Sequence, residues 1–494
     1  MRLRLVSLVV LLVLGSALAA MTASCDRRSE GAIRVAVIGG EPRLPNAPGV
    51  SLSASQAVLA NSVAQGLVRF DARGQVEPGL AETWNVSDDG LSYIFRLANA
   101  EWPNGRRISA QQVARLLRRL LDPSRHRPLR DSLSAVQDIV AMTDRVIEIR
   151  LSRPRPHLLQ LLAQPEFGLI YDGQGSGPFR IDRPNSGERG LRLTREIVVP
   201  DEEEQATEQL DLAGLPAEEA IKAFAVGETD LVLGGTFADL PFAQRADLPR
   251  GALRFDPASG LFGLVPARKG GIAADSEVRR LLSEAIDRDA LVEELAVPGL
   301  LPRTTVLEPG LDGQPDPPEP AWAATPLAER RPALLSAARE LLPEDEENVI
   351  RIAMPSGPGS DLVFQRLADD WGALGIKVER AKPGDSADLR LLDLVAPSTS
   401  PAWFLRRFSC NAATLCDEDL DDLLDGAATT AVPEQRQALF AEAASRIDSL
   451  QLFIPIAAPI RWSLVSKRIN GFAGNRFAIH TLTGLEQRLS RSGE

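Results

Sequence analysis

The stretch that decides the fold runs from Val76 to Leu97 and reads VEPGLAETWNVSDDGLSYIFRL. Asp88-Asp89-Gly90 provides the turn, because glycine adopts the positive φ that such a hairpin needs. The alternating segment Leu91–Leu97 after it predicts a strand. Phe70–Val76 before it resembles a second hairpin turn. Together these features predict two hairpin turns and a strand.

Elements on both sides of this stretch extend the pattern. Upstream, Ile33–Ile38 predicts a first strand that ends at Gly39-Gly40, and Ala57–Val68 has the apolar spacing of a helix. Downstream, Ser109 and Gln112 form a capping box that opens an amphipathic helix, which Asp122-Pro123 ends. The polar face of that helix is basic, with Arg115, Arg118 and Arg119, as expected for a solvated face.

The second half of the chain alternates strands with helices. The predicted strands are Val146–Leu151, Val349–Ala353, Gly375–Glu379 and Leu452–Ile456, and the predicted helices are 334–342, 361–374 and 433–450. A proline-dense segment, 309–326, predicts an irregular connection. Such alternation is typical of α/β lobes.

Composition limits the function. The chain has 494 residues, enough for at least two lobes, and a net charge of −12, which argues against nucleic acid as a partner. Hydrophobic residues make up 44%, as in ordinary globular proteins. With 3 His and 3 Cys there is little material for a metal site, and we expect no metal and no cofactor.

The first 25 residues have the features of an export signal. Arg2 and Arg4 precede the apolar run Leu5–Leu14, and small residues follow. Two cleavage sites compete: Ala17–Ala19 fits release of a soluble protein, whereas Thr22–Cys25 resembles a lipobox. We favour lipidation of Cys25, although Thr22 stands where leucine is usual.

The other two cysteines, Cys410 and Cys416, lie close in sequence. In an oxidising compartment they can form a disulfide. The alternative, half of a zinc site, lacks a nearby histidine or second cysteine pair to complete it. We therefore predict a structural disulfide.

Catalytic motifs are missing. The sequence has no phosphate-binding loop, and Gly173, Gly175 and Gly177 do not have the spacing of a dinucleotide site. Ser176 does not stand in a G-x-S-x-G turn, because Gln174 replaces the first glycine. His126, His157 and His480 are far apart. We expect no enzyme, and a periplasmic hydrolase is the weakest hypothesis.

Several segments, in order, resemble the family 5 extracellular solute-binding proteins, the dipeptide/oligopeptide/nickel-type receptors of bacterial ABC importers. Val76–Leu97 is similar to the family pattern P-G-L-A-E-x-W…S-x-D-G-x-x-Y-x-F-x-L, and Gly175–Phe179 to G-T-G-P-Y/F. Val278–Arg288 is similar to V-R-x-A-x-x-x-A-I-D-R, and Ser466–Phe472 to S-x-x-V-x-G-F. The glycines at 175 and 177 suit a place where two backbones pass closely.

The resemblance implies a periplasmic-binding-protein-like α/β fold (type II, large cluster) with two lobes, a hinge and an extra subdomain. The implied division is an N-terminal signal (1–25), lobe I (31–52, 172–265 and 465–494), an inserted subdomain (53–171) and lobe II (266–464). A ligand would lie between the lobes, and closure would be a hinge motion.

It also implies the function. The chain would be the periplasmic substrate-binding component of an ABC importer, capturing a small peptide or peptide-like solute and delivering it to a membrane permease with its ATPase subunits. We expect a monomer, held at the inner membrane by a lipid anchor, where Asp26 after Cys25 is typical of retention. The alternative is the same fold kept as a non-transporting periplasmic partner or sensor lipoprotein.

One family segment departs from its pattern. In many peptide-binding members an Asp there pairs with the ligand's α-ammonium, but here the matching run Leu394–Leu405 has Ser400 at that place. Ordinary capture through the free amine is therefore in doubt. The candidate ligand-binding residues in this run are Ser398, Thr399, Ser400, Trp403 and Phe404. Two further candidates stand at the end of the first strand: Gly40 and Glu41, the latter as a possible partner for a cationic ligand.

Overall fold

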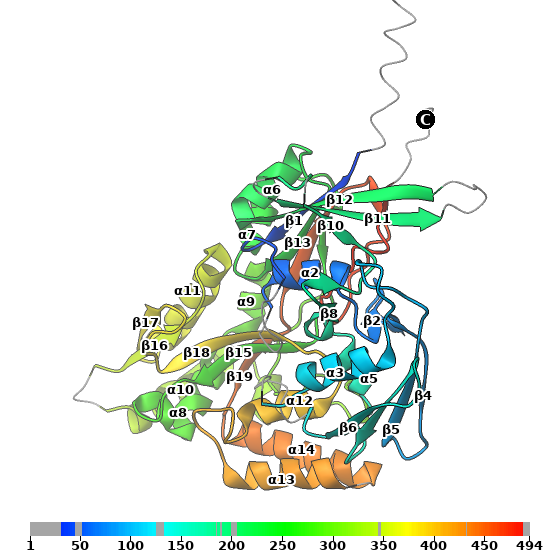
Figure 1. The fold of residues 1–494 in the computed structure, drawn as a ribbon. Coiled ribbons are helices and arrows are strands. Elements are labelled where there is room, and N and C mark those ends of the chain that lie inside the picture. The colour runs from blue at the N-terminus through cyan, green and yellow to red at the C-terminus, as the bar shows by residue number, and fades with distance from the viewer. Residues whose placement is uncertain are drawn as a thin grey trace, which may run out of the picture.

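The structure is a computed structural model that describes residues 31–44, 52–124, 133–183, 185–187, 190–198, 205–343, 347–430 and 432–487. Three bodies make up these residues (Figure 1). Two are built around mixed sheets, which we call lobe I and lobe II, and the third is a smaller subdomain beside them. The predicted signal, Cys25 and His126 lie outside the described residues.

Lobe I is built on a seven-stranded sheet, at the top of Figure 1. Its strands, in spatial order, are β10 (Arg180–Asp182), β11 (Gly190–Val198), β12 (Gln205–Leu215), β1 (Ile33–Ile38), β13 (Leu231–Thr236), β20 (Arg461–Val465) and β14 (Leu253–Phe255). β1 runs parallel to both β12 and β13, whereas the other pairs are antiparallel. The helices α2 (Ala54–Val63), α6 (Ala217–Ala225) and α7 (Leu240–Arg245) pack against this lobe.

Lobe II is built on a five-stranded sheet with helices around it. The strand order is β17 (Lys377–Ala381), β16 (Val349–Ala353), β18 (Leu389–Val395), β15 (Gly260–Pro266) and β19 (Ile454–Ala457). Its helices are α8 (Ser276–Ala285), α9 (Arg288–Leu295), α10 (Leu327–Leu341), α11 (Pro358–Gly372), α12 (Pro401–Leu405), α13 (Glu418–Thr429) and α14 (Pro433–Ser449). α13 and α14 lie antiparallel along the bottom of Figure 1. The predicted α/β class with two lobes is confirmed.

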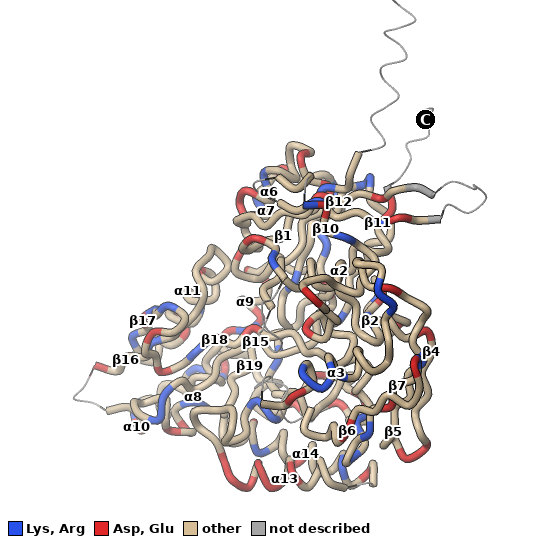
Figure 2. The backbone as a smooth tube through the Cα atoms, viewed as in Figure 1, with Lys and Arg blue, Asp and Glu red and all other residues tan. Residues whose placement is uncertain are grey.

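The subdomain contains the sequence stretch that decides the fold. Its sheet has the order β4 (Ala81–Val86), β5 (Ser92–Leu97), β7 (Val146–Leu151) and β6 (Val136–Ala141). β2 (Val68–Phe70) pairs with β3 (Val76–Pro78), and α3 (Ala110–Leu120) and α5 (Leu158–Leu162) complete the body. Figure 2 shows the arginines of α3 as blue segments. One of them is more than a solvated charge, because Arg118 donates to the carbonyl oxygen of Ile139 on β6.

Local signals in this stretch form as predicted. Gly90 has a φ of 67°, and Asp89 accepts the backbone N–H of Leu91 at 3.0 Å, which closes the turn before β5. Ser109 and Gln112 form a reciprocal capping box at the start of α3. Each signal depends only on residues within a few positions of one another.

The glycines at 175 and 177 lie where two backbones meet closely, as predicted. A Cβ on Gly175 would come within 1.8 Å of the carbonyl oxygen of Val63, at the end of α2. The N–H of Gly177 donates to the same oxygen at 2.8 Å. Glycine is therefore required here because a side chain would clash with the backbone of α2, and not because the backbone has a positive φ.

The helix predicted at 57–68 is shifted in the structure. α2 starts at Ala54, because Ser53 and Gln56 form a capping box, and it ends at Val63. Val68 instead enters β2 and pairs with Pro78. α2 packs on β1 of lobe I, so the subdomain core begins after it, near Leu67, and not at residue 53.

The two connections between the sheets also lie earlier than the predicted boundaries at 265 and 464. β15 pairs with β18 over its whole length, from Gly260 to Pro266, and so belongs to lobe II. β20 pairs with β13 and β14, and so belongs to lobe I. The chain therefore crosses between the lobes at 256–259 and at 458–460.

No helix within the described ranges is both long and apolar enough to cross a bilayer.

Candidate functional site

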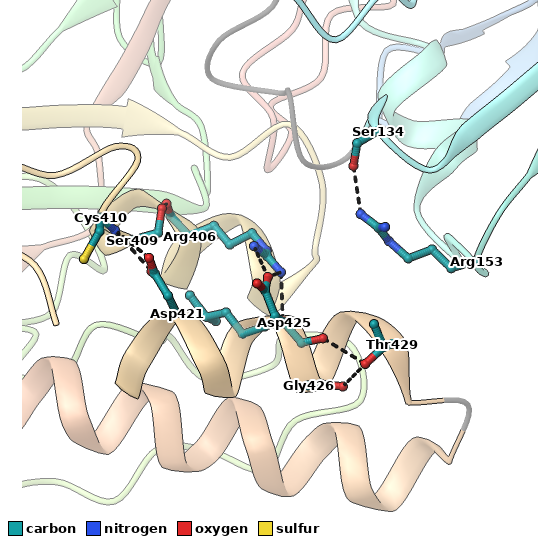
Figure 3. Close-up of polar contacts among 10 residues, drawn as sticks. Ser134, Arg153, Arg406, Ser409, Cys410, Asp421, Asp425, Gly426 and Thr429 are labelled. Carbon is teal, nitrogen blue, oxygen red and sulfur yellow. Dashed lines mark hydrogen bonds and ion pairs between the residues drawn. The ribbon is translucent and has the colours of Figure 1, made fainter. Parts of the chain in front are cut away.

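The segment that follows β18 is held in place by α13. α12 continues into a single 3-10 turn, η5 (Arg406–Phe408). Arg406 bonds to Asp425 at 3.2 Å, and the backbone N–H of Cys410 donates to Asp421 at 3.1 Å (Figure 3). A disulfide joins Cys410 to Cys416, with their Cα atoms 4.9 Å apart. These contacts fix α12 and η5 against α13, whose acidic residues are red along the tube in Figure 2.

A pocket of about 450 Å³ lies between α12 and the subdomain. We call it the α5–α12 pocket. One wall is the subdomain segment 154–161, and the other is formed by 397–403 with the facing ends of α13 and α14, while 312–314 closes a third side. Its volume is within the range of small-molecule sites, which is about 300–1,000 Å³.

Hydrogen bonds connect the two walls of this pocket. The side-chain amide of Gln164 donates to the carbonyl oxygen of Pro397 at 2.8 Å. The backbone N–H of Thr399 donates to Oε1 of Gln160 at 3.2 Å, and the Thr399 hydroxyl donates to Asp312. The 397–400 loop of lobe II is thus tied to the subdomain, and the pocket exists only while these two bodies are together.

Most of the predicted ligand-binding run lies at this pocket. Ser398, Ser400 and Trp403 line it, and Thr399 bonds to two of the lining residues. Phe404 does not reach it: its side chain is fully buried in the core of lobe II, edge-on to Trp403 with ring centroids 5.0 Å apart. That these residues bind a ligand stays a prediction.

Gly40 and Glu41 lie elsewhere. They follow β1 in lobe I, are exposed, and are not among the residues that line the α5–α12 pocket. Glu41 accepts a hydrogen bond from Arg43 at 3.1 Å. The structure therefore does not bring the Glu41 carboxylate to this pocket.

Sequence reasoning missed the partners on the facing walls. His157, Gln160 and Asp312 come from segments that carried no recognised motif. Burial lowers the pKa of His157, and Asp312, whose Oδ2 lies 3.8 Å from Nδ1, opposes that shift only in part. A neutral imidazole is therefore expected near neutral pH. The one of these segments that the sequence analysis singled out was the proline-dense stretch 309–326, which contains Asp312 and was predicted only as an irregular connection.

Trp403 has two unusual contacts. The residue is only 8% exposed, and its buried indole N–H makes no hydrogen bond with the described residues. The guanidinium of Arg407 lies over its ring, 4.8 Å from the ring centroid. Burial lowers the pKa of Arg407 to about 10.

A second cavity of about 460 Å³ lies within lobe II, between the proline-rich segment 315–320 and α14. Asp448 lines it and accepts the backbone N–H of Val306 at 3.0 Å. Burial raises the pKa of Asp448 to about 7, although that hydrogen bond favours the ionised form. This carboxyl makes the folded state sensitive to pH.

We expect Asp448→Asn to stabilise the protein at alkaline pH. The Asp448 carboxyl has a pKa of about 7 in the folded state and about 3.9 in the unfolded chain, so the folded state holds its proton more tightly. The free energy of unfolding therefore falls as pH rises from about 4 to about 7. Asn keeps an acceptor for Val306 without the charge. The variant should gain about 2 kcal/mol at about pH 8 and nothing at about pH 4, measured by urea unfolding. The exposed Asp422→Asn is the control, and an equal gain at both pH values would contradict the assignment.

Within the ranges that the structure describes, no three His, Cys, Asp or Glu side chains gather as a metal site. The α5–α12 pocket instead offers amide and hydroxyl groups, such as those of Gln160, Ser398 and Ser400, beside apolar side chains such as Leu158, Leu161 and Phe440. Such a lining suits the reversible binding of a solute.

Comparisons with known proteins agree with this geometry. The profile of the bacterial extracellular solute-binding proteins, family 5 Middle, matches residues 75–405. The chain is 26% identical to the probable di/tripeptide-binding protein 5 of Pseudomonas aeruginosa, with 86% of this chain and 89% of that protein covered. It is 22% identical to the periplasmic oligopeptide-binding protein OppA of Salmonella typhimurium, with 84% and 85% covered.

Solved structures show the same fold. Haemophilus influenzae OppA in complex with RPPGFSPFR superposes with a TM-score of 0.79 at 18% identity, over 93% of this chain and 100% of that chain. The murein tripeptide binding protein MppA of Escherichia coli gives 0.79 at 17% identity, over 93% and 99%. The family profile covers well over half of the sequence, and the fold agrees with it. The chain therefore belongs to the bacterial extracellular solute-binding proteins of family 5.

Proposed function

We propose that this protein is the periplasmic substrate-binding component of an ABC importer and that it captures a small peptide or peptide-like solute in the α5–α12 pocket. The observation that carries the proposal is the pocket itself, which is closed by hydrogen bonds between the subdomain and the 397–400 loop of lobe II. A site of this kind forms when two bodies come together and is lost when they separate.

The relatives support the class of solute. Those described above are named for binding di/tripeptides or oligopeptides. A further protein of the same fold, from Borrelia burgdorferi, is named as a periplasmic oligopeptide-binding protein and oligopeptide ABC transporter (TM-score 0.78, 16% identity, 93% of this chain and 100% of that chain). These names favour an importer over the alternative of a non-transporting partner or sensor.

Opening and closing would take place at the two crossings. Segments 256–259 and 458–460 connect the sheets, and they are the points about which the lobes would turn. Release of the solute to the permease and its ATPase subunits would require the bonds from Gln160 and Gln164 to the 397–400 loop to break. They are few and each is individually weak, as a reversible closure needs.

The test is a binding measurement with a matched pair of aromatic variants. A tripeptide present at 100 times its dissociation constant should stabilise the purified chain by about 2.7 kcal/mol in a thermal melt. Trp403→Phe, in the α5–α12 pocket, should weaken binding about 10-fold. Trp322→Phe, at the second cavity, should leave affinity unchanged. Indifference of the melt to every peptide tried, or equal losses in both variants, would contradict the proposal.

We further propose that Cys25 carries a lipid anchor, that the protein is a monomer, and that it is held on the periplasmic side of the inner membrane. The support is the export signal and the lipobox-like Thr22–Cys25 run. Acyl chains on Cys25 would keep the protein with the membrane fraction. Cys25→Ala should move most of it to the soluble periplasmic fraction, and an unchanged distribution would show that the anchor is absent.

A further inference from the structure

The second cavity, between the proline-rich segment 315–320 and α14, is built by lobe II alone. Residues of α14 and the following Gln451 form one wall, and α8 contributes Arg280 and Glu284. No residue of lobe I or of the subdomain belongs to its described lining. The second cavity therefore does not depend on contact between two bodies, whereas the α5–α12 pocket does.

The lining of the second cavity is acidic. Its carboxylates are those of Glu284, Asp316, Glu319 and Asp448. Among the described lining residues, Arg280 is the one basic side chain, and it is already engaged: it pairs with Glu277 at 3.2 Å and donates to the carbonyl oxygen of Ser449 at 3.0 Å. The fixed charge around this cavity is therefore negative.

Asp448 uses only half of its carboxylate in the fold. Oδ1 accepts the backbone N–H of Val306 at 3.0 Å. Oδ2 makes no hydrogen bond or ion pair with the described residues, and it is not fully enclosed by protein atoms. Because Asp448 lines the second cavity, Oδ2 is the oxygen that a solute in this cavity can reach.

The fold does not require the charge of Asp448. An asparagine would accept the Val306 N–H equally well, and burial raises the pKa of Asp448 to about 7, so the ionised form is disfavoured in the ligand-free chain. No described lysine or arginine pairs with this carboxylate. A carboxylate in this situation is stabilised when a cationic donor enters the cavity.

Two further acceptors lie on the walls of the same cavity. Gln451 is only 7% exposed; its Nε2 donates to the backbone carbonyl oxygen of Asp448 at 2.5 Å, whereas its buried Oε1 accepts no hydrogen bond from the described residues. The Glu284 carboxylate makes no hydrogen bond with them either. Burial raises the pKa of Glu284, and Arg330 offsets that effect only in part. The described walls thus hold unpaired acceptors and no unpaired cation.

The remaining lining selects the kind of cation. Within the described ranges no three acidic, histidine or cysteine side chains are close enough to hold one metal ion. Apolar groups lie beside the carboxylates instead, namely Leu307, Pro315, Pro317, Pro318, Pro320 and Ala444. Trp322 also lines the cavity, but its ring is already covered by the guanidinium groups of Arg288 and Arg330. Such a lining suits an ammonium group that carries a short alkyl chain.

We propose that the second cavity binds a small organic cation, an alkylammonium whose N–H groups donate to Asp448 and whose alkyl chain lies against the proline-rich segment 315–320. This site is separate from the pocket proposed for the peptide, and it stays formed when the lobes open.

The experiment is isothermal titration calorimetry of the purified chain with n-butylamine. Two compounds of similar size are the controls: n-butanol lacks the charge, and tetramethylammonium lacks the N–H donors. We expect n-butylamine to bind at least 10-fold more tightly than either, because a charged hydrogen bond needs both properties. Equal affinity for n-butylamine and either control compound would contradict the inference.

Variants locate the site. Asp448→Asn should lower the affinity for n-butylamine at least 10-fold, and the variant is expected to fold because it removes a buried charge that opposes folding. Asp422→Asn, on the exposed side of α13, and Asp312→Asn, in the α5–α12 pocket, should leave this affinity unchanged. A loss in Asp312→Asn and none in Asp448→Asn would place the amine in the other pocket, and the inference would be wrong.

The pH dependence of binding gives a second readout. n-Butylamine resembles the lysine side chain, whose pKa is about 10.4, so it stays charged at pH 6 and at pH 8. Over this range the ionised fraction of Asp448 rises about 10-fold, and the affinity should rise by the same factor. Glu284, Asp316, Glu319 and Arg280 also face the cavity, so Asp448→Asn is the reference, and its affinity should change less than about 3-fold.

The outcomes separate this inference from the proposed function. Tripeptide affinity should be the same in Asp448→Asn and in the unmodified chain, because the α5–α12 pocket does not contain this residue. If tripeptides bind and n-butylamine does not, the inference is wrong and the proposed function stands. If n-butylamine binds through Asp448 and no peptide binds, the inference stands and the peptide function is wrong.

Discussion

Glu308→Ala should lower the free energy of unfolding by about 3 kcal/mol, because it removes the centre of a buried polar cluster at the first crossing between the lobes. The Glu308 side chain is only 4% exposed. It lies 2.6 Å from the guanidinium of Arg303, accepts the hydroxyl of Ser259 and accepts the N–H of Gly260 at 3.3 Å. Loss of the carboxylate leaves the Arg303 guanidinium without its counter-charge, with only the carbonyl oxygen of Gly260 as an acceptor at 3.1 Å, and it leaves the buried N–H of Gly260 without its carboxylate acceptor.

The measurement is urea unfolding, with Glu379→Ala as the control. Glu379 makes ion pairs with Arg351 and Lys377 on the surface of lobe II, where each pair is worth at most about 1 kcal/mol. The double variant Glu308→Ala/Arg303→Met should recover part of the loss, since it also removes the unpaired cation. A Glu308→Ala protein as stable as the Glu379→Ala control would show that this cluster does not hold the crossing.

Local chemistry made part of the fold predictable. The first strand, Ile33–Ile38, and the strand Val349–Ala353 have the bounds that alternation and β-branched residues predict. The capping box at Ser109 and the turn at Gly90 also form where they were predicted. In each case the deciding interactions are between residues that are close in sequence.

The borders between the bodies could not be predicted in this way. β15 belongs to lobe II because it pairs with β18, more than 120 positions away, and nothing within Gly260–Pro266 indicates which sheet it joins. The start of the subdomain was misplaced for a related reason. α2 packs on lobe I through Val58 and Leu59, and its apolar spacing is equally compatible with either body.

In the candidate site, too, residues that are close in sequence were predictable and residues that meet only after folding were not. Ser398, Ser400 and Trp403 lie together at the α5–α12 pocket because they are neighbours in the chain, and the resemblance of one segment was enough to identify them. Gln160 and Asp312 come from two other parts of the sequence and meet Thr399 only after folding.

Arg279→Met should be the other strongly destabilising change, with a loss of about 2–4 kcal/mol. Arg279 lies on α8 and is only 3% exposed. Its guanidinium donates to four backbone carbonyls: those of Ala273 and Ala274 before the helix, and those of Leu450 and Gln451 after α14, at 2.7–3.0 Å. A methionine fills similar space without a donor, so these carbonyls lose their partners.

The adjacent arginine is the control for this prediction. Arg280 is on the exposed side of the same helix, where it pairs with Glu277 and donates one hydrogen bond to the carbonyl oxygen of Ser449 at 3.0 Å, so Arg280→Met should cost at most about 1 kcal/mol. Arg279→Lys should give an intermediate loss, because one ammonium group cannot reach all four carbonyls. Ligand affinity at the α5–α12 pocket should be unchanged in any of these variants that folds. If Arg279→Met kept full stability but lost binding, this arginine of the family motif would serve the ligand and not the joint between α8 and α14.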